Sequence, residues 1–209
     1  MQDIGGQALA AFMGFFAIMN PVANTPIFLS LTDGEDKATR RAVAFRAILV
    51  SFAILVVFCL VGHVIFNMFG ITLPAFQITG GILVFLIGFH MLQGTNSPVH
   101  HPPGVEDANS RDTELGVAVT PLAMPILAGP GTIATAMNFV GDGGMVNIGV
   151  TLAAVLAICL ITFVSFIFGE RLVRYLGDSG IKVLTRLMGL ILAVIGTQMV
   201  VTGVTAVMH

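Results

Sequence analysis

Paired prolines interrupt two hydrophobic stretches of this sequence, Met19-Asn20-Pro21-Val22-Ala23-Asn24-Thr25-Pro26-Ile27 and Val119-Thr120-Pro121-Leu122-Ala123-Met124-Pro125-Ile126. A proline inside a helix removes one backbone hydrogen bond and displaces the carbonyl four residues earlier. In hydrocarbon, backbone groups freed in this way are tolerated only where protein buries them or where they line a watery cavity. Paired breaks in the two halves of a membrane chain therefore point to a transporter binding site.

The composition is that of a polytopic membrane protein. Of the 209 residues, 56% are hydrophobic and 10% are charged, and the mean hydropathy is +0.97. Soluble domains carry roughly 25% charged residues. A net charge of −2 gives no indication of a nucleic-acid partner. Cys59 and Cys159 lie in apolar runs, so we expect buried free thiols there and neither a disulfide nor a metal site.

Hydropathy predicts an all-α integral membrane protein with six spans, of which the first and fourth are discontinuous. The expected spans are 5–32, 47–69, 71–93, 115–141, 145–169 and 184–207. All nine Lys and Arg residues fall in or beside the first, third and fifth connections: Lys37, Arg40, Arg41, Arg46, Arg111, Arg171, Arg174, Lys182 and Arg186. Because positive charge accumulates on the cytoplasmic side, we expect those connections to be cytoplasmic and both termini outside.

The two halves of the chain resemble each other. Gly81-Ile82-Leu83-Val84-Phe85-Leu86-Ile87-Gly88 matches Gly189-Leu190-Ile191-Leu192-Ala193-Val194-Ile195-Gly196. With three spans per copy, the second copy must enter the membrane inverted. We expect a first repeat at 1–94, a polar cytoplasmic loop at 95–114 and a second repeat at 115–209. The alternative is chance similarity between apolar helices. The glycines recur every seven residues, Gly203 included, which predicts close helix packing.

Each break should offer charges of both signs to a ligand. We expect the first helix to restart with Asn24 or Thr25 as its N-cap and Pro26 in its first turn, and the second at Gly129-Pro130-Gly131-Thr132. The free N–H groups of such helix starts hold anions, carboxylates included. The carbonyls of Phe16–Met19 and 115–118, at the ends of the preceding half-helices, suit an ammonium group. The pair of polarities suits a zwitterion.

The walls of the breaks are small, which favours a small neutral amino acid such as glycine or alanine over a sugar or a polyamine. A carboxylate would meet the N–H groups of 25–27 and 131–133. The candidate substrate-binding residues are Asn20, Pro21, Ala23, Asn24, Thr25, Pro26, Thr120, Pro121, Ala123, Pro125, Gly129, Pro130, Gly131 and Thr132. The alternative is that the prolines are kinks stabilised by neighbouring helices.

Coupling to an ion stays open. The spans hold no Asp or Glu away from their ends, so the candidates for proton coupling are His63 and His90. A lone histidine near a membrane interface is more often simply hydrogen-bonded, and Na⁺ at the helix-end carbonyls or uncoupled exchange are alternatives. No motif predicts an enzyme, a cofactor or a metal site; His100-His101 reads as part of a solvated loop.

Three runs resemble the MarC family, also called the neutral amino acid transporter family, of bacterial and archaeal inner-membrane proteins. They are Asn20–Phe28, Pro121–Ile133 with its Pro-Leu-Ala-x-Pro-x-x-Ala-Gly-Pro-Gly pattern, and Arg186–Leu192. The resemblance covers essentially the whole chain. It implies six spans in two inverted repeats with helices one and four discontinuous, and transport of glycine and alanine in an archaeal branch.

Two hypotheses of different class follow. The first is a transporter or exporter of small neutral amino acids by alternating access. The second is a membrane scaffold or regulator whose breaks are structural kinks. Export of other small solutes is a variant of the first, whereas export of larger drugs is disfavoured by the small break walls. Substrate, transport direction, depth of the breaks, any role in drug resistance and homo-oligomer formation stay open.

Overall fold

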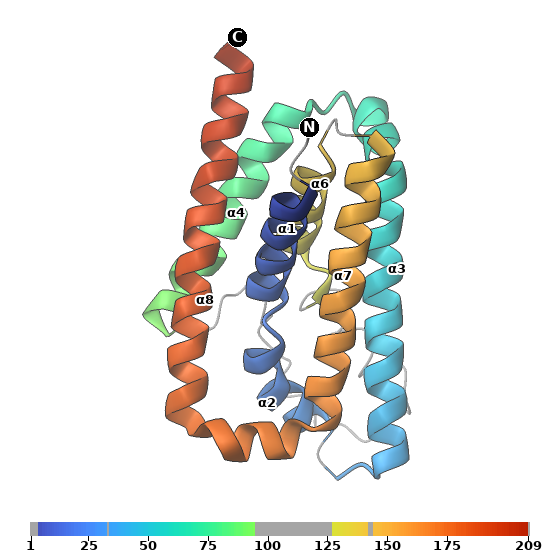
Figure 1. The fold of residues 1–209 in the computed structure, drawn as a ribbon, viewed down its shortest axis with the longest axis vertical. Helices are drawn as coiled ribbons and strands as arrows, with labels where there is room; N and C mark the ends of the chain where they lie inside the picture. Colours follow the sequence, from blue (N-terminus) through green and yellow to red (C-terminus); the bar gives the residue numbers. More distant parts are fainter. Residues whose placement is uncertain (1–3, 33, 95–126, 142–143, 209) are drawn as a thin grey trace.

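The fold was analysed in a computed structural model, which describes residues 4–32, 34–94, 127–141 and 144–208. Within these ranges the secondary structure is entirely helical. The helices are α1 (Ile4–Met19), α2 (Pro21–Leu31), α3 (Lys37–Phe69), α4 (Leu73–Gln93), α6 (Pro130–Val140), α7 (Gly144–Ile167) and α8 (Gly169–Met208). Figure 1 shows them as a bundle in which α1, α2 and α6 lie between the longer helices.

Five helical segments of the described chain are long and apolar enough to cross a membrane: Ile4–Leu29, Lys37–Gly62, Leu73–Gln93, Gly144–Ile167 and Ser179–Met208. They correspond to five of the six predicted spans. Of the remaining one, 115–141, the structure describes only the part from residue 127, which includes α6.

Two predicted boundaries were wrong. Helix α3 begins at Lys37, ten residues before the predicted span, because Asp36 caps it. The Thr39 N–H donates to Asp36 Oδ1 at 2.9 Å, and the Arg40 N–H donates to the Asp36 carbonyl at 2.9 Å. The predicted connection 170–182 is helical and belongs to α8. Gly177, with φ 63° and ψ 170°, turns the chain there, and the preceding segment runs across the lower edge of Figure 1. Charge alone does not interrupt a helix.

The termini and the basic connections lie at opposite ends of the molecule. In Figure 1 both termini are at the upper end, and the α2–α3 connection and the α7–α8 junction are at the lower end. Helix α6 lies in the upper half and α2 in the lower half of the same view. We call the lower end the basic end, since Lys37 begins α3 there and Arg171 lies in the first turn of α8.

Helices α4 and α8 pack backbone to backbone through their glycines. A Cβ on Gly196 would lie 2.4 Å from Phe85 N and 2.5 Å from the Gly81 carbonyl oxygen. A Cβ on Gly88 would lie 2.5 Å from the Gly189 carbonyl oxygen, and one on Gly203 would lie 2.8 Å from that of Pro74. The packing role predicted for these glycines is confirmed. We call this contact the glycine seam.

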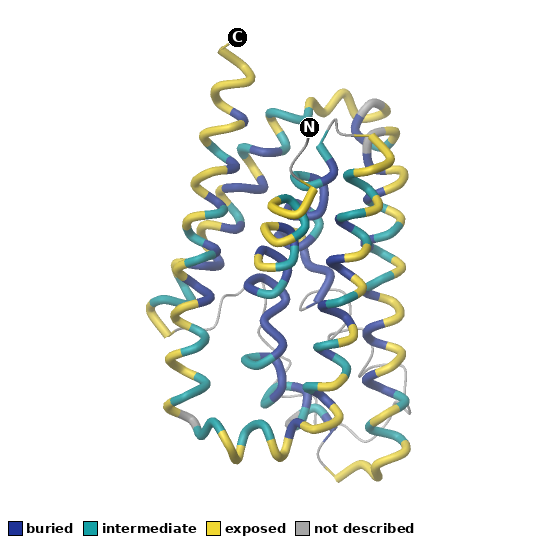
Figure 2. Tube along the Cα trace, in the orientation of Figure 1, coloured by how far each residue is buried: buried dark blue, intermediate teal, exposed yellow. Residues whose placement is uncertain are grey.

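The buried residues concentrate in the middle of the bundle. Figure 2 shows dark blue along much of α1 and α6 and on the inner sides of the long helices, whose outer sides are largely yellow. The outer side of α3 carries exposed apolar residues, among them Phe45, Leu49, Val57, Leu60 and Val64. An apolar exterior is what hydrocarbon requires, so the burial pattern fits a membrane protein.

Candidate functional site

The first proline segment folds into a break of one residue. Helix α1 ends at Met19 and α2 begins at Pro21, and Asn20 between them has a φ of 35°. Asparagine is among the few residues other than glycine that tolerate positive φ. The Asn20 N–H donates to the Phe16 carbonyl at 3.0 Å, and its Oδ1 accepts from the Ala23 N–H at 3.2 Å. Asn20 thus ends one helix and caps the next.

The predicted restart at Asn24 or Thr25 was therefore wrong. Both lie inside α2, and so does Pro26. The Asn24 Nδ2 donates to the Met19 carbonyl at 2.7 Å, and the Thr25 hydroxyl donates to the Pro21 carbonyl at 2.7 Å. The N–H groups of 25–27 are interior to the helix and not available to a carboxylate. Met19, expected to offer an unpaired carbonyl, already has a donor. Because asparagine can both turn and cap the chain, the helix restarts sooner than the second proline suggested.

The second helix start was predicted correctly. Gly129 is the N-cap of α6, with φ −68° and ψ 171°, and Pro130 occupies the first turn. No side chain caps this end. The Ile133 N–H donates to the Gly129 carbonyl at 3.0 Å, and the earlier N–H groups of a helix have no acceptor within it. These groups and the helix dipole give the start of α6 a partial positive charge.

The start of α6 packs against the end of α1. A Cβ on Gly131 would lie 3.0 Å from Ile18 Cδ1 and 2.8 Å from Ile87 Cδ1 of α4. At the other end of α6, Phe139 lies beside Gly14 of α1. The two helices are therefore antiparallel. Thr132 is seven residues, two turns, before Phe139 and shares its α1-facing side, so Thr132 lies within about one turn of Asn20 along the axis.

Two buried groups at this place, Asn20 Nδ2 and Thr132 Oγ1, have no hydrogen-bond partner among the described residues. Asn20 is 4% exposed and Thr132 0%. Buried polar groups are bonded in the great majority of cases, so an unpaired one requires an explanation. The other hydroxyls buried in helices α2, α3 and α7 donate mainly to the carbonyl four residues earlier, as Thr25, Thr32, Ser51 and Thr162 do.

Sequence reasoning missed Thr135 of α6 and Thr151 of α7. Both are fully buried, and within the part of the chain that the structure describes neither hydroxyl has a hydrogen-bond partner. Neither hydroxyl donates to the carbonyl four residues earlier in the chain. No signal in the sequence separates such a threonine from one bonded to its own helix.

Other candidates fall outside this arrangement. Thr120, Pro121, Ala123 and Pro125 are outside the described residues, as is 115–118. His63 belongs to α3, and its side chain is not described. His90 Nδ1 lies 2.7 Å from the Leu86 carbonyl of its own helix, as the hydrogen-bonded interpretation predicted.

The cysteine prediction is confirmed: Cys59 and Cys159 are buried and free. Among the described residues no group of three or more His, Cys, Asp or Glu side chains could hold a metal ion. In the described part of the site, electrostatic recognition therefore falls to helix ends, an amide and a hydroxyl.

Comparison with known proteins connects this geometry to one family. The family model described as "MarC family integral membrane protein" matches residues 7–208. The UPF0056 membrane protein YvbG of Bacillus subtilis is 40% identical over 92% of this chain and 91% of its own. UPF0056 membrane protein MJ1677 of Methanocaldococcus jannaschii is 39% identical over 94% of this chain and 95% of its own. UPF0056 membrane protein YhcE of Escherichia coli is 33% identical over 94% of this chain and 91% of its own. No solved structure matches.

Proposed function

Since the chain belongs to the MarC family of integral membrane proteins, we propose that it is a secondary transporter of small neutral amino acids, glycine and alanine first. The observation that carries the proposal is the pair of unpartnered buried groups, Asn20 Nδ2 and Thr132 Oγ1, where the end of α1 meets the start of α6. A substrate would satisfy both groups, and alternating access would expose it to each side in turn.

The substrate carboxylate is assigned to the first turn of α6, where free N–H groups and the helix dipole favour negative charge. Asn20 Nδ2 would donate to the same carboxylate. The ammonium group would use the Thr132 hydroxyl oxygen and the second lone pair of the α1 carbonyls, since a carbonyl accepts two hydrogen bonds.

The size of the substrate is argued from Gly131. Because even a Cβ there would meet Ile18 and Ile87 within 3.0 Å, the first turn of α6 has apolar walls close to its backbone. This contact leaves no room on that face of α6, so the substrate would lie beside it, where the close apolar walls favour a substrate with no side chain or a methyl group. Large or charged side chains would meet carbon and no counter-charge.

The six-span architecture with inverted repeats at 1–94 and 115–209, joined by the loop 95–114, is part of the proposal. Two features support it. Helices α2 and α6 are both 11 residues long and begin with proline. In the match between the two halves, Gly81 corresponds to Gly189 and Gly88 to Gly196. Replacing both glycines of the Gly81–Gly196 contact by their counterparts gives the Gly88–Gly189 contact, which is also present.

For localisation we propose the prokaryotic inner membrane, with the basic end cytoplasmic and both termini outside. The relatives come from bacteria and archaea, and the positions of the termini and basic connections in Figure 1 are compatible with this orientation.

The test is counterflow of radiolabelled glycine and alanine in proteoliposomes preloaded with the same amino acid. We expect accumulation of label above that in empty liposomes, with competition by small neutral amino acids and none by lysine or glutamate. Absence of flux for every small neutral amino acid would reject the proposal. A scaffold protein with structural kinks would in addition show no thermal stabilisation by glycine.

A further inference from the structure

Two buried aromatic rings stack on each other inside the bundle, between the proposed site and the basic end. Phe28 of α2 and Phe166 of α7 are stacked with their ring centroids 4.4 Å apart and an interplanar angle of 3°. Their exposures are 0% and 1%. Phe28 lies two turns beyond Pro21, so the stack is on the basic side of the break at Asn20.

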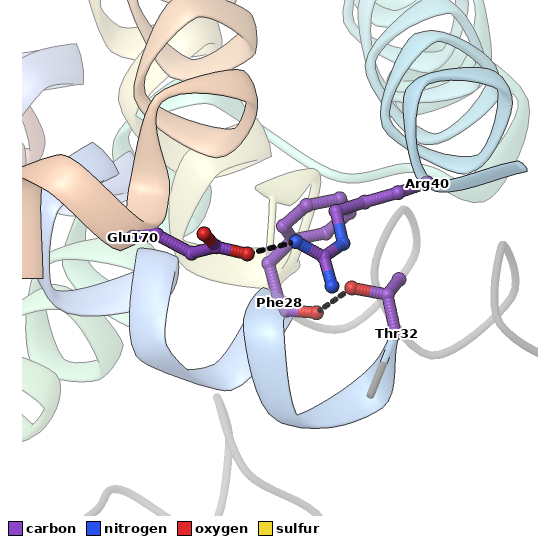
Figure 3. Close-up of polar contacts among 4 residues, drawn as sticks. All are labelled: Phe28, Thr32, Arg40 and Glu170. Carbon is purple, nitrogen blue, oxygen red and sulfur yellow. Dashed lines mark hydrogen bonds and ion pairs between the residues drawn. The ribbon is translucent and has the colours of Figure 1, made fainter. Parts of the chain in front are cut away.

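An ion pair lies next to this stack. Arg40 Nη1 of α3 donates to Glu170 Oε1, at the start of α8, at 2.6 Å. Figure 3 shows these two side chains reaching toward each other from different elements, with Phe28 of α2 and Thr32, the residue after α2, drawn beside them. The Thr32 hydroxyl donates to the Phe28 carbonyl at 2.8 Å, so α2 is continuous up to this point.

The α7–α8 junction rests directly on α2. A Cβ on Gly169 would lie 2.8 Å from Thr25 Cγ2 and 3.2 Å from Leu29 Cδ2. Four elements, α2, α3, α7 and α8, therefore meet in one layer on the basic side of the site. We call the pairs Phe28–Phe166 and Arg40–Glu170 the closing layer.

We propose that the closing layer is the closed gate of the transporter at its basic end, and that both pairs must separate for substrate to pass between the site and that side. The inference rests on the proposed function. The inference follows from the position of the layer on the basic side of the site and from the kind of contacts that hold it together. Its contacts are between side chains, whereas the glycine seam joins backbones and leaves no freedom to separate.

The energetics of the layer suit a contact that opens. The Glu170 side chain is 68% exposed, and exposed ion pairs contribute little to stability. Arg40 Nε is buried without a partner in the closed arrangement and would become hydrated on opening. The single-residue turn at Asn20 gives α2 a place about which to swing, since hinges are a few terminal residues of an element that absorb the change in backbone angles.

The test is a reversible cross-link across the layer. Cys59→Ala and Cys159→Ala remove the native thiols, and Arg40→Cys with Glu170→Cys places a thiol on each side. A short bifunctional methanethiosulfonate reagent joins them, and a reductant releases them. We expect glycine counterflow to fall at least tenfold on cross-linking and to recover on reduction, with glycine still stabilising the cross-linked protein against heat.

The matched control is Arg171→Cys with Arg174→Cys in the same background. These exposed residues lie one turn apart on α8, at the same end of the molecule. Cross-linking them joins no two elements and should leave flux unchanged. Normal flux after complete cross-linking of 40 to 170, verified by mass, would overturn the gate and leave the transport proposal standing. Absence of flux in the parent protein would overturn both.

Discussion

Helices α2 and α6 have the same length and both begin with proline, yet they treat their polar groups in opposite ways. In α2, Asn20 caps the first turn, and the Thr25 hydroxyl is bonded to its own helix. In α6, Gly129 offers no side chain as a cap, and the Thr132 hydroxyl is buried without a partner. The Thr25 hydroxyl of α2 is therefore satisfied within its own helix, whereas the Thr132 hydroxyl of α6 is left for something else to satisfy.

The energetic argument gives this difference its meaning. Leaving a buried donor or acceptor unsatisfied costs about 1–3 kcal/mol. Thr135 adds a second unpaired hydroxyl to α6. We infer that α6 is the helix that recognises the ligand, and that α2 is the helix that turns at Asn20 and carries one side of the closing layer.

The largest effect is expected from Thr132→Val compared with Thr25→Val. Each change removes a buried hydroxyl and keeps the branched shape. A hydrogen bond to a charged group contributes about 1.5–3 kcal/mol, so Thr132→Val should weaken glycine binding roughly 10- to 100-fold. Thr25→Val should change it less than about threefold, since its hydroxyl is used inside α2.

Ligand affinity is read from the half-saturating glycine concentration in counterflow, and folding from the thermal midpoint without amino acid. Thr132→Val should leave the unliganded midpoint unchanged or raise it, because it removes a buried polar group that had no partner. Equal losses of affinity in the two variants would show that α2 and α6 share recognition equally.

The second prediction concerns the glycine seam between α4 and α8. Gly196→Ala places a methyl group 2.4 Å from Phe85 N in the glycine seam. We expect overpacking to lower the free energy of unfolding by about 1–3 kcal/mol. The measurement is the thermal midpoint in detergent, followed by circular dichroism.

Gly149→Ala is the matched control for the seam. Gly149 is also within a membrane-spanning helix, α7, but a Cβ there would meet nothing within 4 Å. Because alanine favours helix over glycine, the control should be neutral or stabilising by up to about 1 kcal/mol. If both alanines behave alike, α4 and α8 can separate, and the contrast between seam and closing layer fails.

The third prediction tests the turn at Asn20. Asn20→Ala loses the cap and forces an ordinary side chain to φ 35°. Loss of an N-cap costs about 0.5–2 kcal/mol and a left-handed conformation about 1–2 kcal/mol, so we expect a combined loss of about 1.5–4 kcal/mol. Asn20→Gly accepts the angle and should lose only a few tenths, about 0.3 kcal/mol.

Both Asn20 variants are compared by thermal unfolding without amino acid, so that lost ligand contacts do not enter. If Asn20→Gly is as damaging as Asn20→Ala, the backbone angle is not what asparagine supplies. The role of Asn20 in the structure would then rest on the cap alone.

Much of the fold was readable because hydropathy, proline and glycine act locally. The start of α6 at Gly129-Pro130 followed from cap chemistry, and the seam followed from glycines spaced by seven residues. The start of α3 was missed because Asp36 lies in a charged stretch, where hydropathy gives no signal. The helical segment 169–176 was missed for the same reason.

The site was predictable in place more than in detail. The predicted start of α6 at Gly129-Pro130 is correct, whereas the helix after the first break begins at Pro21 and not after Asn24 or Thr25, because Asn20 acts as turn and cap at once. Whether a buried threonine bonds its own carbonyl depends on its rotamer, which tertiary packing sets. Thr25 and Thr132 are therefore equivalent in sequence and opposite in structure.

The smallest effect concerns the outer part of the closing layer, which pH should loosen. The hydrogen bond from Arg40, followed by its positive charge, lowers the pKa of Glu170 below its ordinary value of 4.5. A carboxyl whose pKa is lower in the folded protein stabilises it above the ordinary pKa and loses that contribution as the pH falls through the folded value. The thermal midpoint should therefore decline slightly more steeply below about pH 4.5 in the parent than in Glu170→Gln.

The control for that comparison is Glu35→Gln, which removes a carboxylate from the neighbouring α2–α3 connection at the same end of the molecule. It keeps the Arg40–Glu170 pair and should retain the steeper decline. Because exposed ion pairs are screened by salt, the difference between the parent and Glu170→Gln should shrink in high salt. A difference that persists in high salt would mean that the pair is not screened as an exposed ion pair is, and the argument that it separates easily would fail.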